Sequence, residues 1–339
     1  MKKTISAAAI VFTAVILIFP TTATEAAREA MYRAATGVVP SLFCFMVASK
    51  ILVSGGGATV IALLFKPASA VLRLSPDEAD CFAVGALCGF PTGAAVAAET
   101  SKKNNYSRKR ATALAALANN VSPGFMISFV GAGIYHSVLV GLVLYFIQII
   151  SAALVALPSR QYRTFSQRAS QNTSQSFPSL FCKAVSESAL SCIYLTGFIV
   201  AFSVIAAYAS LAAEHFGIPS APLVSFFEIT SGLPSFLSLP YPLSLGAVAF
   251  FASFSGLSVI FQSATFLVEC GVSMVKYVML KVIQGLVAAA LSAVILPRVA
   301  DNTAAVAATF VQNDIPSVAL FLLIIATFVG IKIKHYIKG

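Results

Sequence analysis

The residues of this chain that could bind a ligand are small and polar residues in the middle of apolar stretches. The first group is Gly89, Pro91, Thr92 and Gly93, which interrupts an apolar run over residues 79–98. About 20 apolar residues are enough for a helix to cross a bilayer. Because proline removes a backbone donor and glycine frees the backbone, we expect two half-helices that meet near mid-membrane. Free backbone groups at such a break are tolerated where they line a polar cavity, so the break is a candidate substrate site.

A second polar group follows in the next apolar stretch. Asn119, Asn120 and Ser122 stand directly before Pro123 and Gly124 and interrupt an expected helix over residues 107–133. Two amides and a hydroxyl at membrane depth are costly unless they bind something. They either contribute to a ligand site or hydrogen-bond across the break, and the sequence leaves both readings open.

Other kinds of chemistry find no support in the residue pattern. The six cysteines form no Cys-x-x-Cys pair, and the three histidines are scattered near segment ends without ligand spacing. No catalytic triad or Walker motif is present, so we expect no catalytic residue, no metal site and no ATP hydrolysis. The chain is therefore predicted not to be an enzyme and to have no cofactor, with Na⁺ or H⁺ as candidate coupling ions.

The composition of the chain indicates that these residues lie in a membrane. Hydrophobic residues make up 58% of the chain, charged residues 10%, and the mean hydropathy is +0.90. Soluble domains carry about 25% charged residues, so the chain is predicted to be an all-α, multi-pass integral membrane protein. The net charge of +10 collects mostly in short connecting segments, as the positive-inside rule requires, and nucleic acid is not an expected partner.

The order of apolar and polar segments predicts an inverted repeat of about five elements in each half, each half with a re-entrant helical hairpin. The two hairpins end alike, at Glu99 and Glu269. The predicted parts are a first transmembrane helix and an interfacial amphipathic helix (1–37), a first repeat (38–157) with a re-entrant hairpin (79–100) and a broken helix (107–133), a basic cytoplasmic linker (158–182), and a second repeat (183–339) with a hairpin (245–269).

Four motifs in order suggest a family. They are Gly89-Phe90-Pro91-Thr92-Gly93, the run from Asn119 to Phe125, the run from Glu228 to Gly232, and the run from Ser255 to Gln262. With them the chain resembles the nucleoside-recognition (Gate) domain family, in its sporulation integral membrane protein branch. The resemblance implies a scaffold similar to concentrative nucleoside transporters, with paired re-entrant hairpins around a mid-membrane site. It also implies a place in the outer forespore membrane and a role in moving dipicolinate during spore formation.

The resemblance also implies which residues bind substrate. Dipicolinate is a flat ring with two carboxylates, and half-helix N-termini with amide donors suit carboxylates. Glu228 is the awkward member, because a carboxylate repels an anion unless it is protonated, binds a coupling cation or lies outside the pocket. The implied substrate-binding residues are Gly89, Pro91, Thr92, Gly93, Asn119, Asn120, Ser122, Glu228, Thr230, Ser231, Ser255, Gly256, Ser258 and Gln262.

The predicted function is transport of a small organic anion, with dipicolinate as the implied substrate. A nucleoside transporter is an alternative, but concentrative nucleoside transporters have Gln, Thr and Glu at the first tip, where this chain has Phe90-Pro91-Thr92. A scaffold or assembly factor for the spore envelope is another alternative. Membrane lipid, a second copy of the chain and other sporulation membrane proteins are the expected partners.

Overall fold

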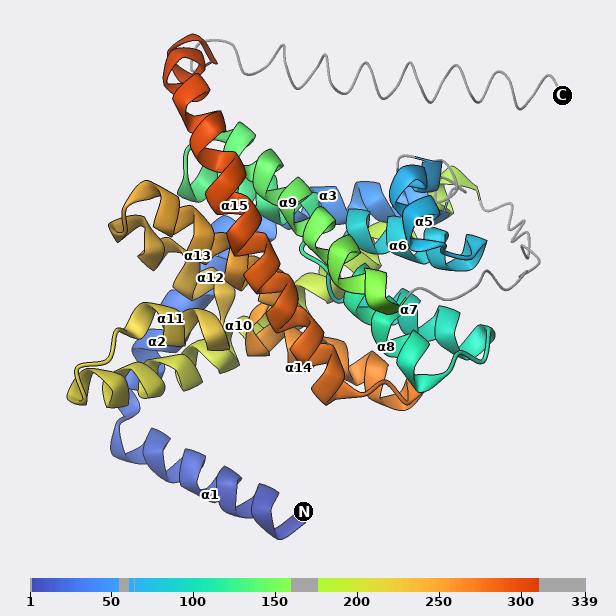
Figure 1. The fold of residues 1–339 in the computed structure, drawn as a ribbon. Helices are drawn as coiled ribbons and strands as arrows, with labels where there is room; N and C mark the ends of the chain where they lie inside the picture. The colour runs from blue at the N-terminus through green and yellow to red at the C-terminus, as the bar shows by residue number, and fades with distance from the viewer. Residues whose placement is uncertain (1, 55–60, 64, 160–175, 311–339) are drawn as a thin grey trace, which may run out of the picture. The chain divides into compact units, whose positions relative to one another are not determined.

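The computed structural model describes residues 2–54, 61–63, 65–159 and 176–310, and every regular element within these ranges is helical (Figure 1). The chain divides into two compact units, Met1–Ser292 and Ala293–Gly339. All of the candidate site lies in the first unit. The three arginines of the predicted linker and the predicted last span (315–331) lie outside the described residues.

The first half of the chain forms short helices joined by tight connections. These are α1 (Lys2–Ile18), α2 (Pro20–Arg33), the π-helix η1 (Ala34–Val38), α3 (Val39–Leu52), α5 (Lys66–Leu72), α6 (Pro76–Cys88), α7 (Thr92–Lys103), α8 (Arg108–Ala118), the π-helix η3 (Gly124–Ile134), α9 (Val138–Ala156) and the 3₁₀ turn η4 (Leu157–Ser159).

The second half begins and ends with long helices. These are α10 (Phe177–His215), α11 (Ser220–Phe227), α12 (Ile229–Gly232), the 3₁₀ segment η5 (Leu233–Ser238), α13 (Tyr241–Phe254), α14 (Gly256–Leu267), the 3₁₀ turn η6 (Val268–Cys270) and α15 (Met274–Phe310).

The integral membrane character is confirmed. Five helical stretches among the described residues are long and apolar enough to cross a bilayer. They are Pro20–Leu52, Val138–Ala156, Phe177–His215, Tyr241–Cys270 and Met274–Leu296.

The amino-terminal region differs from the prediction of a separate interfacial helix within residues 1–37. Here α2, η1 and α3 follow one another without a break and form one stretch of 33 residues. Gly37 does not end the helix, because it lies within the π-helical turn Ala34–Val38, which connects α2 to α3. Linker residues from Phe177 onward likewise belong to the long helix α10.

Helix α6 starts where the sequence places a helix cap. The Ser75 hydroxyl accepts a hydrogen bond from the backbone N–H of Glu78, and the Glu78 carboxylate accepts one from the N–H of Ser75. Arg110 of α8 donates to the other Glu78 oxygen at 2.7 Å, and this bond raises the pKa of the Arg110 guanidinium. The Tyr106 ring lies against the guanidinium at 4.0 Å. These contacts join the N-terminal ends of α6 and α8.

The same pattern of helices occurs once in each half. In the first half α6 and α7 pack along one another as a hairpin, and the next stretch, α8 to η3, is unwound at its middle. In the second half α11 packs against α12 and η5 as a shorter hairpin, and the next stretch, α13 to α14, is interrupted at Ser255. A relation by inversion across a membrane stays a prediction.

This pattern changes the assignment of residues 245–269. The sequence predicts a hairpin there, but α13 and α14 do not pack along one another. Helix α14 packs instead on α7, α10 and α11. The stretch 245–269 is therefore an interrupted helix rather than a hairpin, and a repeat relation between the two halves stays a prediction.

Candidate functional site

The tip of the first hairpin is built by glycines that allow close backbone approach. Gly89 has φ +71°, a left-handed conformation, and a Cβ there would lie 2.6 Å from the backbone nitrogen of Ser122. A Cβ on Gly93 would lie 2.3 Å from the carbonyl oxygen of Ala118, and one on Gly85 would lie 2.2 Å from the same atom. The predicted residues Gly89 and Gly93 thus bring the tip onto the break that begins at Asn119.

Asn119 connects four elements at this break. Its side-chain oxygen accepts a hydrogen bond from the N–H of Ala94, in the first turn of α7. Its amide nitrogen donates to the hydroxyls of Ser263 in α14 and Tyr277 in α15, both at 2.7 Å. The N–H of Ala94, expected to be free for a substrate carboxylate, is therefore already bound to the protein.

Asn120 belongs to a second set of hydrogen bonds that the sequence reading missed. Its side-chain oxygen accepts from Lys281 Nζ at 3.2 Å and from Gln284 Nε2 at 2.8 Å, both from α15. Lys281 also donates to the carbonyl oxygen of Asn119 at 3.0 Å and to Gln284 Oε1 at 2.7 Å. Gln148 of α9 donates to the carbonyl of Val121. The polar groups of the first break thus bond to the protein itself.

Lys281 could have been found from the sequence. A lysine inside a long apolar stretch is costly in a membrane and marks a functional or paired position. Lys281 is 0% exposed, as are Asn119 and Asn120. The sequence did not reveal its role because two of its three partners, Asn119 and Asn120, are about 160 residues away in the sequence.

The tip of the second hairpin is organised by Glu228, which is 1% exposed. Its carboxylate accepts hydrogen bonds from the N–H groups of Thr230 and Ser231, at 3.0 and 2.7 Å, and from the Thr230 hydroxyl at 2.6 Å. Glu228 therefore caps the N-terminus of α12, where a negative charge is favoured. This bonding explains the buried carboxylate without a bound cation.

Ser231 extends this tip toward two other helices. Its hydroxyl is bonded to Ser203 of α10 and accepts from an Arg33 nitrogen, each at 2.9 Å. Arg33 ends α2, so a guanidinium from the amino-terminal helix lies beside the second tip. Its Nε is buried and has no hydrogen-bond partner among the described residues.

The second break is formed by two residues with left-handed backbone conformation, Ser255 (φ +79°) and Gly256 (φ +69°). A Cβ on Gly256 would lie 3.2 Å from the carbonyl oxygen of Ser225, so α14 begins against the second hairpin. The Ser255 side chain does not cap α14. Nearly two turns into α14, Gln262 donates to the Ser258 hydroxyl at 3.3 Å.

Both tips and both breaks contribute to one small cavity. Phe90 comes from the first tip and Phe125 from the turn after the first break, while Val38, Leu42 and Leu195 add apolar walls. The second half supplies Glu228, Ile229, Thr230, Ser258, Val259 and Gln262. The enclosed space is about 10 Å³, roughly the room that one water needs, so this conformation is closed to a larger ligand.

The structure therefore divides the predicted site residues into two groups. Glu228, Thr230, Ser258 and Gln262 line the cavity. The others do not line it: they are Gly89, Pro91, Thr92, Gly93, Asn119, Asn120, Ser122, Ser231, Ser255 and Gly256.

Of the eight buried side-chain polar atoms without a partner among the described residues, three lie near the second tip and one, Gln148 Oε1, lies at the first break. Besides Arg33 Nε, the buried hydroxyls of Ser225 and Ser253 have no partner among the described residues. Ser225 lies in the second hairpin and Ser253 two residues before the second break. Because buried polar groups are nearly always bonded, these atoms point to water or a ligand in this half.

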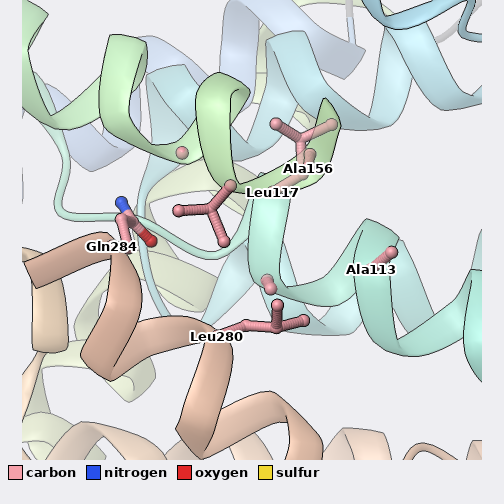
Figure 2. A pocket seen from close by; sticks show the side chains of 8 residues that line it. Ala113, Leu117, Ala156, Leu280 and Gln284 are labelled. Atoms are coloured by element: carbon pink, nitrogen blue, oxygen red, sulfur yellow. The ribbon is translucent and has the colours of Figure 1, made fainter. Parts of the chain in front are cut away.

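Two further hollows lie outside the cavity. One, of about 370 Å³, is an open groove with the side chains of Glu99, Lys102, Lys103 and Glu269, and Lys102 and Glu269 form an exposed ion pair at 3.6 Å. The other is an apolar cleft bordered by α8, α9 and α15, where Figure 2 shows Gln284 beside Leu117 and Leu280. This cleft has no enclosed room for a water molecule.

Comparison with known proteins gives one relative. The sporulation integral membrane protein YlbJ of Bacillus subtilis (strain 168) is 26% identical over 319 residues, which cover 82% of this chain and 78% of the relative. No family model matches the chain. No solved structure matches it either. The chain is thus an integral membrane protein with a sporulation membrane protein among its relatives.

Proposed function

We propose that this protein is a membrane transporter or facilitator that moves a small organic anion, dipicolinate, during spore formation. The observation that carries the proposal is the cavity to which Phe90, Phe125, Glu228 and Gln262 contribute from two hairpin tips and two broken helices. Transporter sites are commonly formed by discontinuous helices that meet within the membrane. The relative with a sporulation name supports the biological setting.

The lining of the cavity suits a flat ring that carries carboxylates. Phe90 and Phe125 offer aromatic faces, against which a planar ring packs well. The Gln262 amide, the Ser258 hydroxyl and the uncapped start of α14 offer donors for a carboxylate. The Arg33 guanidinium, whose Nε has no partner in the described part of the chain, is a nearby positive charge for a second carboxylate.

Transport requires that this closed cavity opens. An aromatic dicarboxylate is many times larger than the present space of about 10 Å³. The second tip is the part we expect to move, because polar atoms near it that have no partner among the described residues would gain partners when a ligand enters. The first tip is held by the bonds of Asn119 and serves as the fixed wall.

The test is uptake of labelled dipicolinate, uridine and an aliphatic dicarboxylate into proteoliposomes. We expect saturable uptake of dipicolinate that falls about 10-fold or more in Gln262→Ala, since a donor to the carboxylate is lost. Thr265→Ala is the matched control, because Thr265 lies on the same helix and bonds only to its own helix at Gln262. Equal uptake in the two variants, or no uptake of any solute by the wild type, would argue against the proposal and for a scaffold role.

A further inference from the structure

The ammonium of Lys281 occupies a position that suits a coupling cation. In transporters with broken helices, unwound carbonyls and the C-terminal ends of half-helices bind the coupling ion. Helix α8 ends at Ala118, and the carbonyl of Asn119, the first residue beyond it, accepts from Lys281 Nζ. The negative end of the α8 dipole therefore faces this ammonium.

The ligands of the ammonium are neutral oxygens. They are the backbone carbonyl of Asn119 and the amide oxygens of Asn120 and Gln284, at 2.7 to 3.2 Å. Among the described residues, no carboxylate forms an ion pair with Lys281. Neutral carbonyl and amide oxygens are the groups that hold a hard cation in proteins, so the three-oxygen set suits an ion as well as an ammonium.

A structural role alone does not require a charge at this position. A neutral donor such as an amide could bond to the same oxygens, whereas an ammonium without a counter-ion is expensive to bury. Water does not reduce that cost from the side of α8 and α9, because the cleft beside Gln284 has no room for it (Figure 2). A basic side chain at this buried position is therefore the feature that needs an explanation.

We infer that Lys281 is a tethered cation that takes the place of a soluble coupling ion at the first break. It holds Asn119, Asn120 and α15 together permanently, so the first half stays closed without Na⁺. One consequence is that uptake by the wild type does not require a Na⁺ gradient, and this consequence rests on the proposed transport function. Its structural part, a cation cage at the break, can be tested without transport.

The experiment measures the melting temperature of purified protein in NaCl and in choline chloride at equal ionic strength. In Lys281→Ala the three oxygens lose their ammonium, and we expect Na⁺ to raise the melting temperature by about 3 °C relative to choline. The wild type is expected to melt at the same temperature in both salts. Lys276→Ala removes an exposed ammonium from the same helix and is expected to behave as the wild type.

Two results would overturn the inference. One is a folded Lys281→Ala variant that melts equally in both salts. The other is a wild-type protein that melts at a higher temperature in Na⁺ than in choline, or whose uptake requires a Na⁺ gradient. This second result overturns the inference even if Lys281→Ala does not fold. Absence of any uptake overturns the transport proposal alone, because the cation cage is measured by melting.

Discussion

The side chain of Asn119 donates to the hydroxyl of Tyr277 at 2.7 Å, although 158 residues separate the two. Both residues are fully buried. Asn119 also holds Ala94 of the first hairpin and Ser263 of α14. One amide thus joins the first tip, the first break, the helix after the second break and α15.

Asn119→Ala should therefore destabilise the protein strongly. The change leaves the N–H of Ala94 without its acceptor and the hydroxyls of Ser263 and Tyr277 without a shared partner, at a cost of about 3 kcal/mol or more. Thermal unfolding of the detergent-purified protein measures it. Asn104→Ala, at the half-buried end of α7, is the control and should cost less. Equal losses would mean that the break is not held by Asn119.

The close contact of the first tip with the first break gives a second prediction. Gly93→Ala places a methyl 2.3 Å from the Ala118 carbonyl oxygen, and we expect a loss of about 2 kcal/mol or more. Gly197→Ala in α10 is the control, because beyond its own helical turn no atom of the described residues lies within 4 Å of the new methyl, and it should gain up to about 1 kcal/mol from helix propensity. Melting curves of both variants test this, and a neutral Gly93→Ala would contradict the packing.

The helix breaks could be predicted from sequence because their cause is local. Proline at 91 and 123, and glycine at 89, 93 and 124, limit which backbone conformations are open to the chain. The observed helices end at Cys88 and Ala118, at these positions. Ser255 and Gly256 similarly mark the break between α13 and α14.

The partners of these breaks could not be predicted in the same way. Whether residues 245–269 fold back on themselves depends on what covers α14, and α7, α10 and α11 cover it. The Lys281 contacts at the first break depend equally on long-range packing. The role of Glu228 was left open because its cap depends on the turn that begins α12.

A pH prediction concerns Tyr106, which lies between α7 and α8. Burial raises the pKa of its phenol above the ordinary value of 10.0. A phenol that holds its proton more tightly in the folded state stabilises the fold fully below about pH 10, and this contribution is lost as pH rises through the raised pKa. The melting temperature of the wild type should fall toward that of Tyr106→Phe as the pH rises from about 9 to about 12, with most of the fall above pH 10. A difference that stays constant over this range would contradict the prediction.

The last prediction separates the alternatives for Glu228. If its carboxylate serves as the α12 cap, Glu228→Gln should keep uptake and lose about 1–2 kcal/mol of stability, because one of two acceptor oxygens is replaced by a donor. The anion substrate should then bind about 3- to 10-fold more tightly, as a like charge has left the cavity lining. The KM for dipicolinate and the melting temperature measure the two effects.

Glu269→Gln is the matched control for this experiment. Glu269 is exposed at the outer groove, where it pairs only with Lys102 among the described residues, so neither KM nor stability should change by more than a small factor. Abolished uptake in Glu228→Gln with normal stability would instead mean that this carboxylate binds a cation or carries a proton during transport. The cap geometry, in which all three donors belong to Thr230 and Ser231, argues for the first outcome.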